Sequence, residues 1–329
     1  MSLLANNSSN PIVEVRDLQT WFPVKTGLLG RTRDHIKAVD KVSLQVYTGE
    51  IVALVGESGC GKSTLGNCLA GLLPIQGGEL SFRGQSAIKN NQLRRDVFQN
   101  KVQVIFQDPY SCLNPKHTVF EILSFPLLYH KICDSKNVSD YIASLLEQVG
   151  MSPEYMNRYP HSFSGGQRQR ISIARAIGMK PELMICDEIV SSLDVSIQAQ
   201  IVELLLELRE KLGLALLFIA HDLSLVRSLS DRLYVMYLGK IVESGKTAEV
   251  LSNPMHPYTR ALVQSVPTLD RSRPPIILQG EVPSFSNMPK GCSFQNRCPN
   301  RSDQCLGEPQ ISQAENREIR CFHPVNHQS

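Results

Sequence analysis

The hydrophobic positions of this chain change along its length between the spacing of strands and the spacing of helices. Apolar residues predict strands at 12–15, 42–46 and 51–55, and alternating apolar and polar residues over 78–106 predict further strands. From 119 to 151 the spacing becomes helical. The first half of the chain is therefore expected to begin with strands and to continue into helices.

The second half of the chain predicts a β-α-β unit that follows one more helix. The helix is expected at 167–179, and the unit at 183–186, 197–212 and 214–220. This alternation favours the α/β class, with a mostly parallel sheet and ligands at the carboxyl ends of its strands. Beyond the unit the chain becomes rich in proline and then in cysteine, so we expect a C-terminal extension at 266–329.

A glycine-rich loop follows the strand predicted at 51–55 and precedes a helical run at 63–72. It fits G-x-x-x-x-G-K-[ST], a motif whose backbone N–H groups wrap around nucleotide phosphates. Its residues are Gly56, Glu57, Ser58, Gly59, Cys60, Gly61, Lys62, Ser63 and Thr64. Glycine-rich turns beside a lysine also arise by chance, but the strand–loop–helix context is the one that the motif requires.

Two adjacent carboxylates, Asp187 and Glu188, follow the apolar strand predicted at 183–186. Carboxylates in this position are suited to hold Mg²⁺ and to activate a water molecule. The glycine-rich loop and the acidic strand end together predict an ATPase.

Composition narrows the possible partners. Charged residues make up 20% of the chain, the formal net charge is +3 and the basic residues are scattered, so no nucleic acid partner is expected. Residues 1–10 do not resemble a signal peptide. The most apolar stretch, 212–220, has nine residues, which is less than half a membrane span. Any membrane role is therefore expected to be peripheral.

More motifs complete a recognisable series. They are Gln107 after the strand at 104–106, Ser164-Gly165-Gly166-Gln167 before a helix, Ser192-Leu193-Asp194, and His221 after the strand at 216–220. With the loop and the acidic strand end, the series resembles the ATP-binding subunit of an ABC transporter over residues 11–265. The resemblance implies an ABC-type P-loop nucleotide-binding domain, with a RecA-like parallel-sheet core, an antiparallel β subdomain and a helical subdomain at about 108–165. The cysteine-rich extension at 266–329 would follow this domain.

The resemblance implies which residues bind the phosphates and the metal ion. Lys62 would pair with the β- and γ-phosphates, and the main-chain amides of 59–64 would bind phosphate oxygens. Ser63, Gln107 and Asp187 would hold Mg²⁺.

It also implies which residues act in hydrolysis and in base recognition. Glu188 would act on the attacking water as general base, and His221 would contact the γ-phosphate. The structural alternatives are a polar strand end for Gln107 and a surface-loop histidine for His221. Family spacing favours Phe22 for stacking on adenine. Trp21 is the alternative, unless its ring packs in the core.

The turn at 164–167 predicts a dimer. In this family Ser164, Gly165, Gly166 and Gln167 would bind the γ-phosphate held by the opposite subunit, because the positive end of a helix dipole suits an anion. One such turn and one phosphate loop per chain cannot complete a site, so two subunits must meet. Asp194 would lie at that interface, and capping of the next helix is its alternative role.

Finer details resemble the oligopeptide/dipeptide importer branch, and within it the F-type ATPase subunit. They are Phe106-Gln107-Asp108-Pro109-Tyr110, Leu113-Asn114-Pro115, the runs 163–170 and 193–200, and the tail with Gly291-Cys292 and Arg297-Cys298-Pro299. In that branch two different ATPases pair beneath two permeases, at the cytoplasmic face of the membrane. An extracytoplasmic binding protein delivers peptides, although relatives carry nickel or other small solutes. The helical region at 108–165 would receive the permeases.

Two other hypotheses remain. A soluble ABC ATPase acting on nucleic acid or ribosomes usually carries tandem nucleotide domains or long coiled coils, and neither is visible here. A regulatory or metal-binding subunit that hydrolyses ATP poorly is suggested by Ile189 and by the cysteine-rich tail. Ile189 and Ser192 stand where the family has proline and alanine. Ile189 restores an N–H group and frees the backbone torsion that proline fixes. Because Glu188 is present, activity is expected.

Four cysteines, Cys292, Cys298, Cys305 and Cys321, are concentrated in the tail. Their spacing is too wide for the C-x₂-C element of common zinc sites. The family shares this pattern, and four thiolates suit a [4Fe–4S] cluster or Zn²⁺, with free thiols as the third possibility. The five dispersed cysteines are expected to be reduced thiols.

Overall fold

The computed structural model describes residues 10–26, 31–89, 92–94, 98, 100–191, 193–266, 283–285, 288–314 and 316–325. Ser192 and most of the proline-rich segment expected after residue 266 lie outside the described residues. The chain divides into two compact units, which are described separately. Unit 1 comprises Met1–Ile12, Tyr47–Glu50 and Arg94–Phe218, and unit 2 comprises Val13–Val46, Ile51–Leu93 and Ile219–Ser329.

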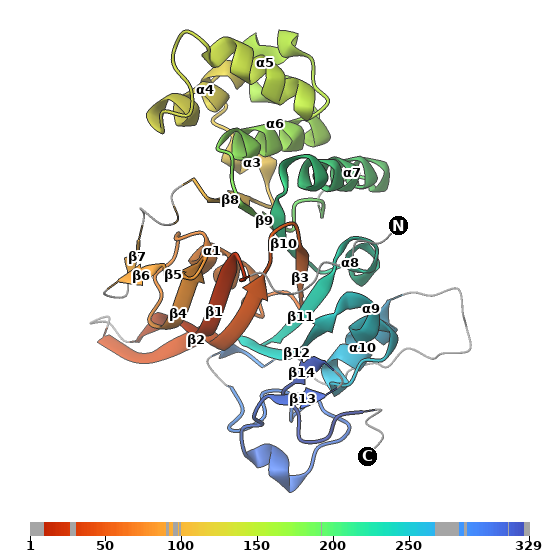
Figure 1. Cartoon of the computed structure of the whole chain (residues 1–329). Coiled ribbons are helices and arrows are strands. Elements are labelled where there is room, and N and C mark those ends of the chain that lie inside the picture. The colour runs from red at the N-terminus through yellow and green to blue at the C-terminus, as the bar shows by residue number, and fades with distance from the viewer. Residues whose placement is uncertain are drawn as a thin grey trace. The chain divides into compact units, whose positions relative to one another are not determined.

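Unit 1 combines parallel strands with a group of helices (Figure 1). β8 (Val102–Ile105) lies parallel to β9 (Leu183–Asp187), and β10 (Ala215–Ala220), whose residues 215–218 belong to this unit, is the next strand. β10 is buried along its whole length, as expected of a strand covered on both faces. The helices and turns are α3 (Pro109–Cys112), α4 (Val119–Tyr129), α5 (Val138–Gln148), η1 (Pro153–Asn157), η2 (Pro160–Ser162), α6 (Gly165–Gly178) and α7 (Val195–Leu212).

Local sequence explains where these helices begin and which side they bury. α4 starts at a capping box, in which the Thr118 hydroxyl accepts from the Glu121 N–H (3.3 Å) and the Glu121 carboxylate accepts from the Thr118 N–H (2.7 Å). On and just after α5, the predicted face of Leu145, Leu146 and Val149 is buried, which confirms the helical spacing.

Unit 2 holds an antiparallel sheet, a mixed one and a short antiparallel pair made by β6 and β7. The first has the order β2-β1-β4-β5, and the second contains β13-β14-β12-β11-β3 as consecutive neighbours, with β11 parallel to β3. The strands are β1 (Val13–Thr26), β2 (Arg31–Val46), β3 (Ile51–Val55), β4 (Gly77–Phe82), β5 (Gln85–Ser86), β6 (Ile88–Lys89), β7 (Gln92–Leu93), β11 (Arg232–Tyr237), β12 (Lys240–Lys246), β13 (Ser312–Ala314) and β14 (Arg317–Ile319). The helices and turns are α1 (Lys62–Leu69), α8 (Leu223–Leu229), α9 (Thr247–Ser252), α10 (Pro257–Ser265) and η4 (Asp303–Leu306).

The end of the chain adds to the second sheet of unit 2. β14 lies beside β12 (Figure 1), with Glu243 opposite Ile319 in antiparallel register. Arg317 of β14 also reaches the Glu243 carboxylate (3.7 Å), and both side chains are buried. That carboxylate accepts hydrogen bonds from the N–H groups of Met255 (3.0 Å) and His256 (2.8 Å). One buried charge thus joins β12, β14 and the start of α10.

Most predicted elements are present, many with boundaries shifted by one or two residues, and the helical run at 119–151 is divided into α4 and α5. The strands expected at 12–15, 42–46 and 51–55 fall in or overlap β1, β2 and β3, and the β-α-β unit is β9-α7-β10. The helical run expected to reach 72 stops at Leu69, so that boundary was wrong. Gly71 is left-handed (φ 73°), and the Leu72 N–H donates to the Asn67 carbonyl (2.8 Å), the pattern of a Schellman stop.

His256 makes the stability of unit 2 depend on pH. Its ring is buried at the start of α10, where Nδ1 accepts from the Tyr258 N–H (3.1 Å), and burial lowers its pKa from 6.5 to about 3. Below pH 6.5 the unfolded chain binds a proton that the folded chain does not, so stability falls as the pH falls through that window.

We expect wild type to lose about 1 kcal/mol more stability than His256→Asn between about pH 6 and about pH 5. Asparagine also caps helices but does not titrate, so it isolates the imidazole contribution. Urea unfolding at both pH values measures this difference, and equal losses in the two proteins would contradict it.

Candidate functional site

The glycine-rich loop of unit 2 curls around the ammonium group of Lys62. The fully buried strand β3 leads into the loop, and α1 begins immediately after Gly61. Lys62 is only 4% exposed, and its Nζ donates to the carbonyls of Gly56 (2.9 Å) and Glu57 (3.1 Å). The predicted strand–loop–helix arrangement is confirmed, with the charged group held inside the curve of the main chain.

Two glycines of the loop are required by close backbone contacts. A Cβ atom on Gly56 would lie 2.2 Å from the Met236 carbonyl oxygen, and one on Gly61 would lie 2.2 Å from that of Ala38. Gly59 is different, because nothing lies within 4 Å of a Cβ built there, although its φ of 76° also favours glycine. The loop is therefore packed tightly at its two ends and is open at its middle glycine.

Glu57 connects the loop to two residues whose contact with it the sequence did not indicate. The Tyr258 hydroxyl accepts from the Glu57 N–H (2.8 Å), and the Arg297 guanidinium donates to both Glu57 carboxylate oxygens (2.7 and 3.0 Å). No local pattern could have identified these partners, since Arg297 lies 240 positions away. The neighbouring Cys60 is buried, which raises the pKa of its thiol, so at neutral pH it adds no negative charge to the loop.

The acidic strand end of unit 1 forms a small hydrogen-bonded group. Asp187 ends β9, and Glu188 follows with a left-handed backbone (φ 49°). The Gln107 amide, beyond the end of β8, donates to the Glu188 carboxylate (3.0 Å) and to the Ser191 hydroxyl (3.4 Å). The structure therefore brings Gln107 and Glu188 together. Burial, and then the charge of Asp187, raise the pKa of the adjacent Cys186 to about 12, so this thiol stays neutral.

The turn after Glu188 is held without the proline of the family pattern. The Ser191 N–H and hydroxyl both donate to the Glu188 carbonyl (3.1 and 2.8 Å), and the Ile189 side chain is completely buried. Sequence reasoning overlooked Ser191, whose position three residues after Glu188 is the available signal, since a serine there can close a turn.

The turn at 164–167 begins α6 with a capping box. The Ser164 hydroxyl accepts from the Gln167 N–H (3.3 Å), and the Gln167 side chain accepts from the Ser164 N–H (3.1 Å). A Cβ atom on Gly166 would lie 2.6 Å from Cγ2 of Ile197 on α7, whereas one on Gly165 would meet Leu193 at 3.3 Å. Gly166 is thus required by packing between two helices, and Ser164 stands exposed at the helix start.

The remaining candidates lie on strand ends and helix starts. Asp194 is at the N-cap position of α7, but its side chain makes no capping hydrogen bond. The alternative role of Asp194 as a helix cap is therefore matched by its position and not by a hydrogen bond. His221 is exposed at the end of β10, in unit 2. On β1, Phe22 is 36% exposed, while Trp21 is partly buried with the Lys37 ammonium 5.5 Å from its ring centre.

The four tail cysteines are free thiols that belong to one folded region. The Cys292 N–H donates to the Cys305 carbonyl (3.0 Å). Burial, and to a smaller extent the charges of Cys292, Cys298 and Cys305, raise the pKa of Cys321 to about 12. Within the residues that the structure describes, no three His, Cys, Asp or Glu side chains are placed to hold a metal ion.

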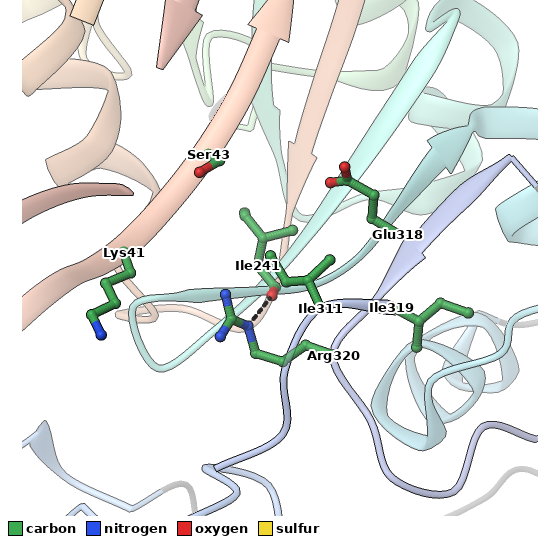
Figure 2. Close-up of a pocket in the computed structure, with 7 residues that line it drawn as sticks. All are labelled: Lys41, Ser43, Ile241, Ile311, Glu318, Ile319 and Arg320. Carbon is green, nitrogen blue, oxygen red and sulfur yellow. Dashed lines mark hydrogen bonds between the residues drawn. The ribbon is translucent and has the colours of Figure 1, made fainter. Parts of the chain in front are cut away.

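A small pocket lies between the sheets of unit 2 and the end of the chain (Figure 2). Its lining residues are Lys41, Ser43, Ile241, Ile311, Glu318, Ile319 and Arg320. The dashed line in Figure 2 marks the hydrogen bond from Arg320 Nε to the Ile241 carbonyl (3.2 Å). The pocket shares no residue with the glycine-rich loop, and we assign no ligand to it.

Comparison with known families identifies the class of protein. A model described as "ABC transporter" matches residues 39–191, which include the glycine-rich loop, the turn at 164–167 and the acidic strand end. A model described as "Oligopeptide/dipeptide transporter, C-terminal region" matches 242–305. The chain belongs to the ABC transporter family, among its ATP-binding proteins.

Individual relatives agree with this assignment. The chain is 46% identical to the oligopeptide transport ATP-binding protein AppF of Bacillus subtilis (strain 168), over 92% of this chain and 94% of the relative. It is 42% identical to the dipeptide transport ATP-binding protein DppF of Escherichia coli (strain K12), over 98% of this chain and 97% of the relative.

Solved structures show the same fold. CbiO1 from Clostridium perfringens, part of the ABC transporter complex cbiONQ, aligns with a TM-score of 0.63 at 25% identity, over 74% of this chain and 92% of its own. The dimeric ATP-binding cassette MJ0796, bound to ADP and Pi, aligns with a TM-score of 0.60 at 26% identity, over 71% and 98%. The expected ABC ATPase fold of mixed sheets and helices is therefore confirmed. None of the helices in the described ranges is long and apolar enough to cross a membrane.

A Cβ atom added at Gly166 would lie 2.6 Å from Cγ2 of Ile197. Gly166→Ala should therefore lower the unfolding free energy by about 1–3 kcal/mol through overpacking. Gly165→Ala is the matched control and should cost less, since its new methyl meets a flexible leucine end at 3.3 Å. Removing the Ile197 branch should relieve the clash, so Gly166→Ala with Ile197→Ala should lose less than the sum of the two single losses. Chemical denaturation measures all four variants, and strict additivity would contradict the proposed contact.

Proposed function

We propose that this chain binds Mg²⁺–ATP and hydrolyses it to drive an importer of oligopeptides or dipeptides. The observation that carries the proposal is the loop folded around the Lys62 ammonium, with an open middle glycine, in a chain of this family. The substrate class is supported by the names of the relatives, which are oligopeptide and dipeptide transport proteins.

The first phosphate contacts would come from the glycine-rich loop. Lys62 would exchange its carbonyl partners for the β- and γ-phosphate oxygens, and the amides of 59–64 at the start of α1 would bind the other oxygens. Ser63, Gln107 and Asp187 would hold Mg²⁺, which neutralises phosphate charge when bound. His221 would contact the γ-phosphate. Phe22, which is partly exposed on β1, would stack on adenine.

Glu188 would be the general base. Its carboxylate already accepts a hydrogen bond from the Gln107 amide, and the Ser191 donors fix the carbonyl that follows it. A carboxylate held in this way needs little reorganisation to accept a proton from water, and phosphoryl transfer depends mostly on such positioning.

A second subunit would complete the site. Ser164 is exposed at the start of a long helix, where the dipole favours a phosphate, and Gly165, Gly166 and Gln167 shape that end. The solved relative MJ0796 is dimeric with ADP and Pi, which supports a dimer here. We propose that the partner is a different ATPase of the same importer, with Asp194 at the interface.

The transporter would contain two permeases and an extracytoplasmic binding protein, with this chain peripheral at the cytoplasmic face of the membrane. An exposed aromatic surface on α4 supports a permease contact within the helical subdomain at about 108–165. Phe125 is 72% exposed and Tyr129 is 70% exposed, and their rings stack at 6.1 Å. Large apolar side chains exposed together commonly mark a protein interface. Isolation with two multi-span proteins would exclude a soluble ABC ATPase.

The boundary between the ATP-binding domain (11–265) and the extension (266–329) is also a proposal.

We infer that the extension carries a metal site formed by Cys292, Cys298, Cys305 and Cys321, with a [4Fe–4S] cluster favoured over Zn²⁺. Four soft thiolate donors suit the chemistry of either group, but the structure does not place the thiols together, so they would have to draw closer on binding. A bound cation would lower the pKa values of the Cys292, Cys298 and Cys321 thiols, which burial now raises.

Glu188→Gln should keep Mg²⁺–ATP binding but lower the hydrolysis rate at least about 100-fold, because glutamine cannot accept the proton. Phosphate release by the reconstituted complex measures the rate. Glu207→Gln, which changes an exposed helix residue paired with Lys211, is the matched control and should retain wild-type turnover. Equal, near-zero rates for wild type and Glu188→Gln would exclude the catalytic role and favour a regulatory subunit.

Anaerobically purified protein should be brown, with absorbance near about 400 nm, if the tail holds a cluster. Stoichiometric zinc in a colourless protein would favour Zn²⁺ instead. Serine at both Cys292 and Cys298 should abolish metal binding, whereas Cys133→Ser, outside the tail, should not affect it. The absence of both iron and zinc would leave free thiols and refute the metal site.

A further inference from the structure

The C-terminal extension reaches the glycine-rich loop through one ion pair. Arg297 Nη1 lies 2.7 Å from one Glu57 carboxylate oxygen, and Nη2 lies 3.0 Å from the other. The Arg297 side chain is 7% exposed and that of Glu57 is 23% exposed. A two-point contact between planar groups fixes orientation as well as distance, and partial burial strengthens it.

Arg297 is itself held from the extension side. Its N–H donates to the Phe294 carbonyl (3.0 Å), which closes a short turn. Phe294 is buried against Tyr237 and Tyr258, with ring centres 5.2 and 5.5 Å away. The backbone that carries the Arg297 guanidinium is therefore fixed by packed aromatic side chains.

Glu57 transmits this restraint to Lys62. Its N–H donates to the Tyr258 hydroxyl (2.8 Å), and its carbonyl accepts from Lys62 Nζ (3.1 Å) and from the Cys60 N–H (3.3 Å). Fixing the side chain and the N–H of Glu57 leaves its carbonyl little freedom. The direction in which Lys62 points thus depends on a contact made by the extension.

The extension does not need Arg297 for its attachment. β14 pairs with β12, and the buried Arg317 reaches Glu243. An additional buried arginine directed at the loop is best explained by an effect on the loop itself.

We propose that Arg297 is a positioning residue for the phosphate loop, which makes ATP affinity depend on the C-terminal extension. By binding both carboxylate oxygens of Glu57, it holds the loop in the shape that receives nucleotide phosphates. The inference rests on the proposed function, because it takes this loop to be the ATP site.

Mg²⁺–ATP titrated into the full-length chain in a calorimeter tests the proposal. Arg297→Gln should raise Kd about tenfold, through loss of the two charge-assisted hydrogen bonds. Arg297→Lys, which keeps the charge but not the two-point geometry, should give a smaller increase. In the reconstituted complex KM for ATP should rise by a similar factor, while kcat at saturating ATP stays within about twofold of wild type.

A double-variant comparison shows whether the effect passes through Glu57. Glu57→Gln alone should weaken binding as Arg297→Gln does, and the two together should be no weaker than either one. Exposed Arg301→Gln is the neutral control. Arg317→Gln is the structural control, because it loosens the extension without contacting the loop. Thermal unfolding of each variant is measured beside its titration. If Arg297→Gln fails to fold, the ATP affinity of Glu57→Gln is compared with that of wild type instead.

Several outcomes would overturn the inference. These are wild-type affinity in Arg297→Gln, additive effects in the double variant, and equal weakening by Arg317→Gln, which would indicate general loosening of the extension. If Glu57→Gln has to decide alone, wild-type affinity in that variant overturns it. Failure of wild type to bind Mg²⁺–ATP would instead overturn the proposed function, and this inference with it.

Discussion

A buried ammonium group sets the shape of the phosphate loop. Lys62 is nearly inaccessible to solvent, and a charge removed from water must find oxygen partners inside the protein. The carbonyls of Gly56 and Glu57 supply them only if the main chain curls back over the lysine. That curl brings the loop against the carbonyls of Met236 and Ala38, which leave no room for side chains at its ends. The need for glycine at both ends of the loop therefore follows from the curl that surrounds the lysine.

The two turns at the site residues of unit 1 and the phosphate loop of unit 2 are restrained by interactions of different range. In unit 1 the Glu188 turn is closed by Ser191, three residues away, and the Ser164 turn by Gln167, also three residues away. In unit 2 the loop depends on Tyr258 and Arg297, which are distant in sequence. Local turns form whenever their own few residues are correct. The loop acquires its final restraints only when the end of the chain has folded onto it.

This difference in range also explains how much could be predicted from sequence. Strands β3, β9 and β10, helices α6 and α7 and the phosphate loop follow from local spacing, because their signals lie within a few residues. The end of α1 was misplaced, because the left-handed Gly71 outweighs the apolar Leu72. The Arg297–Glu57 pair joins distant segments and has no signal in the local hydrophobic pattern. Strands β13 and β14 have three residues each, which is too short to show alternation. Contacts between distant segments come from the assembled fold.

The pairing of β14 with β12 has a consequence for the newly made chain. A strand with one unpaired side offers N–H and C=O groups to any other extended chain, and such edges promote aggregation. β12 has seven residues, while the outermost strand β13 has three, so the hairpin replaces a long edge by a short one. Because β14 follows β12 at a distance along the chain, β12 lacks this partner until the segment with β14 has left the ribosome. During that interval the protein would depend most on chaperones.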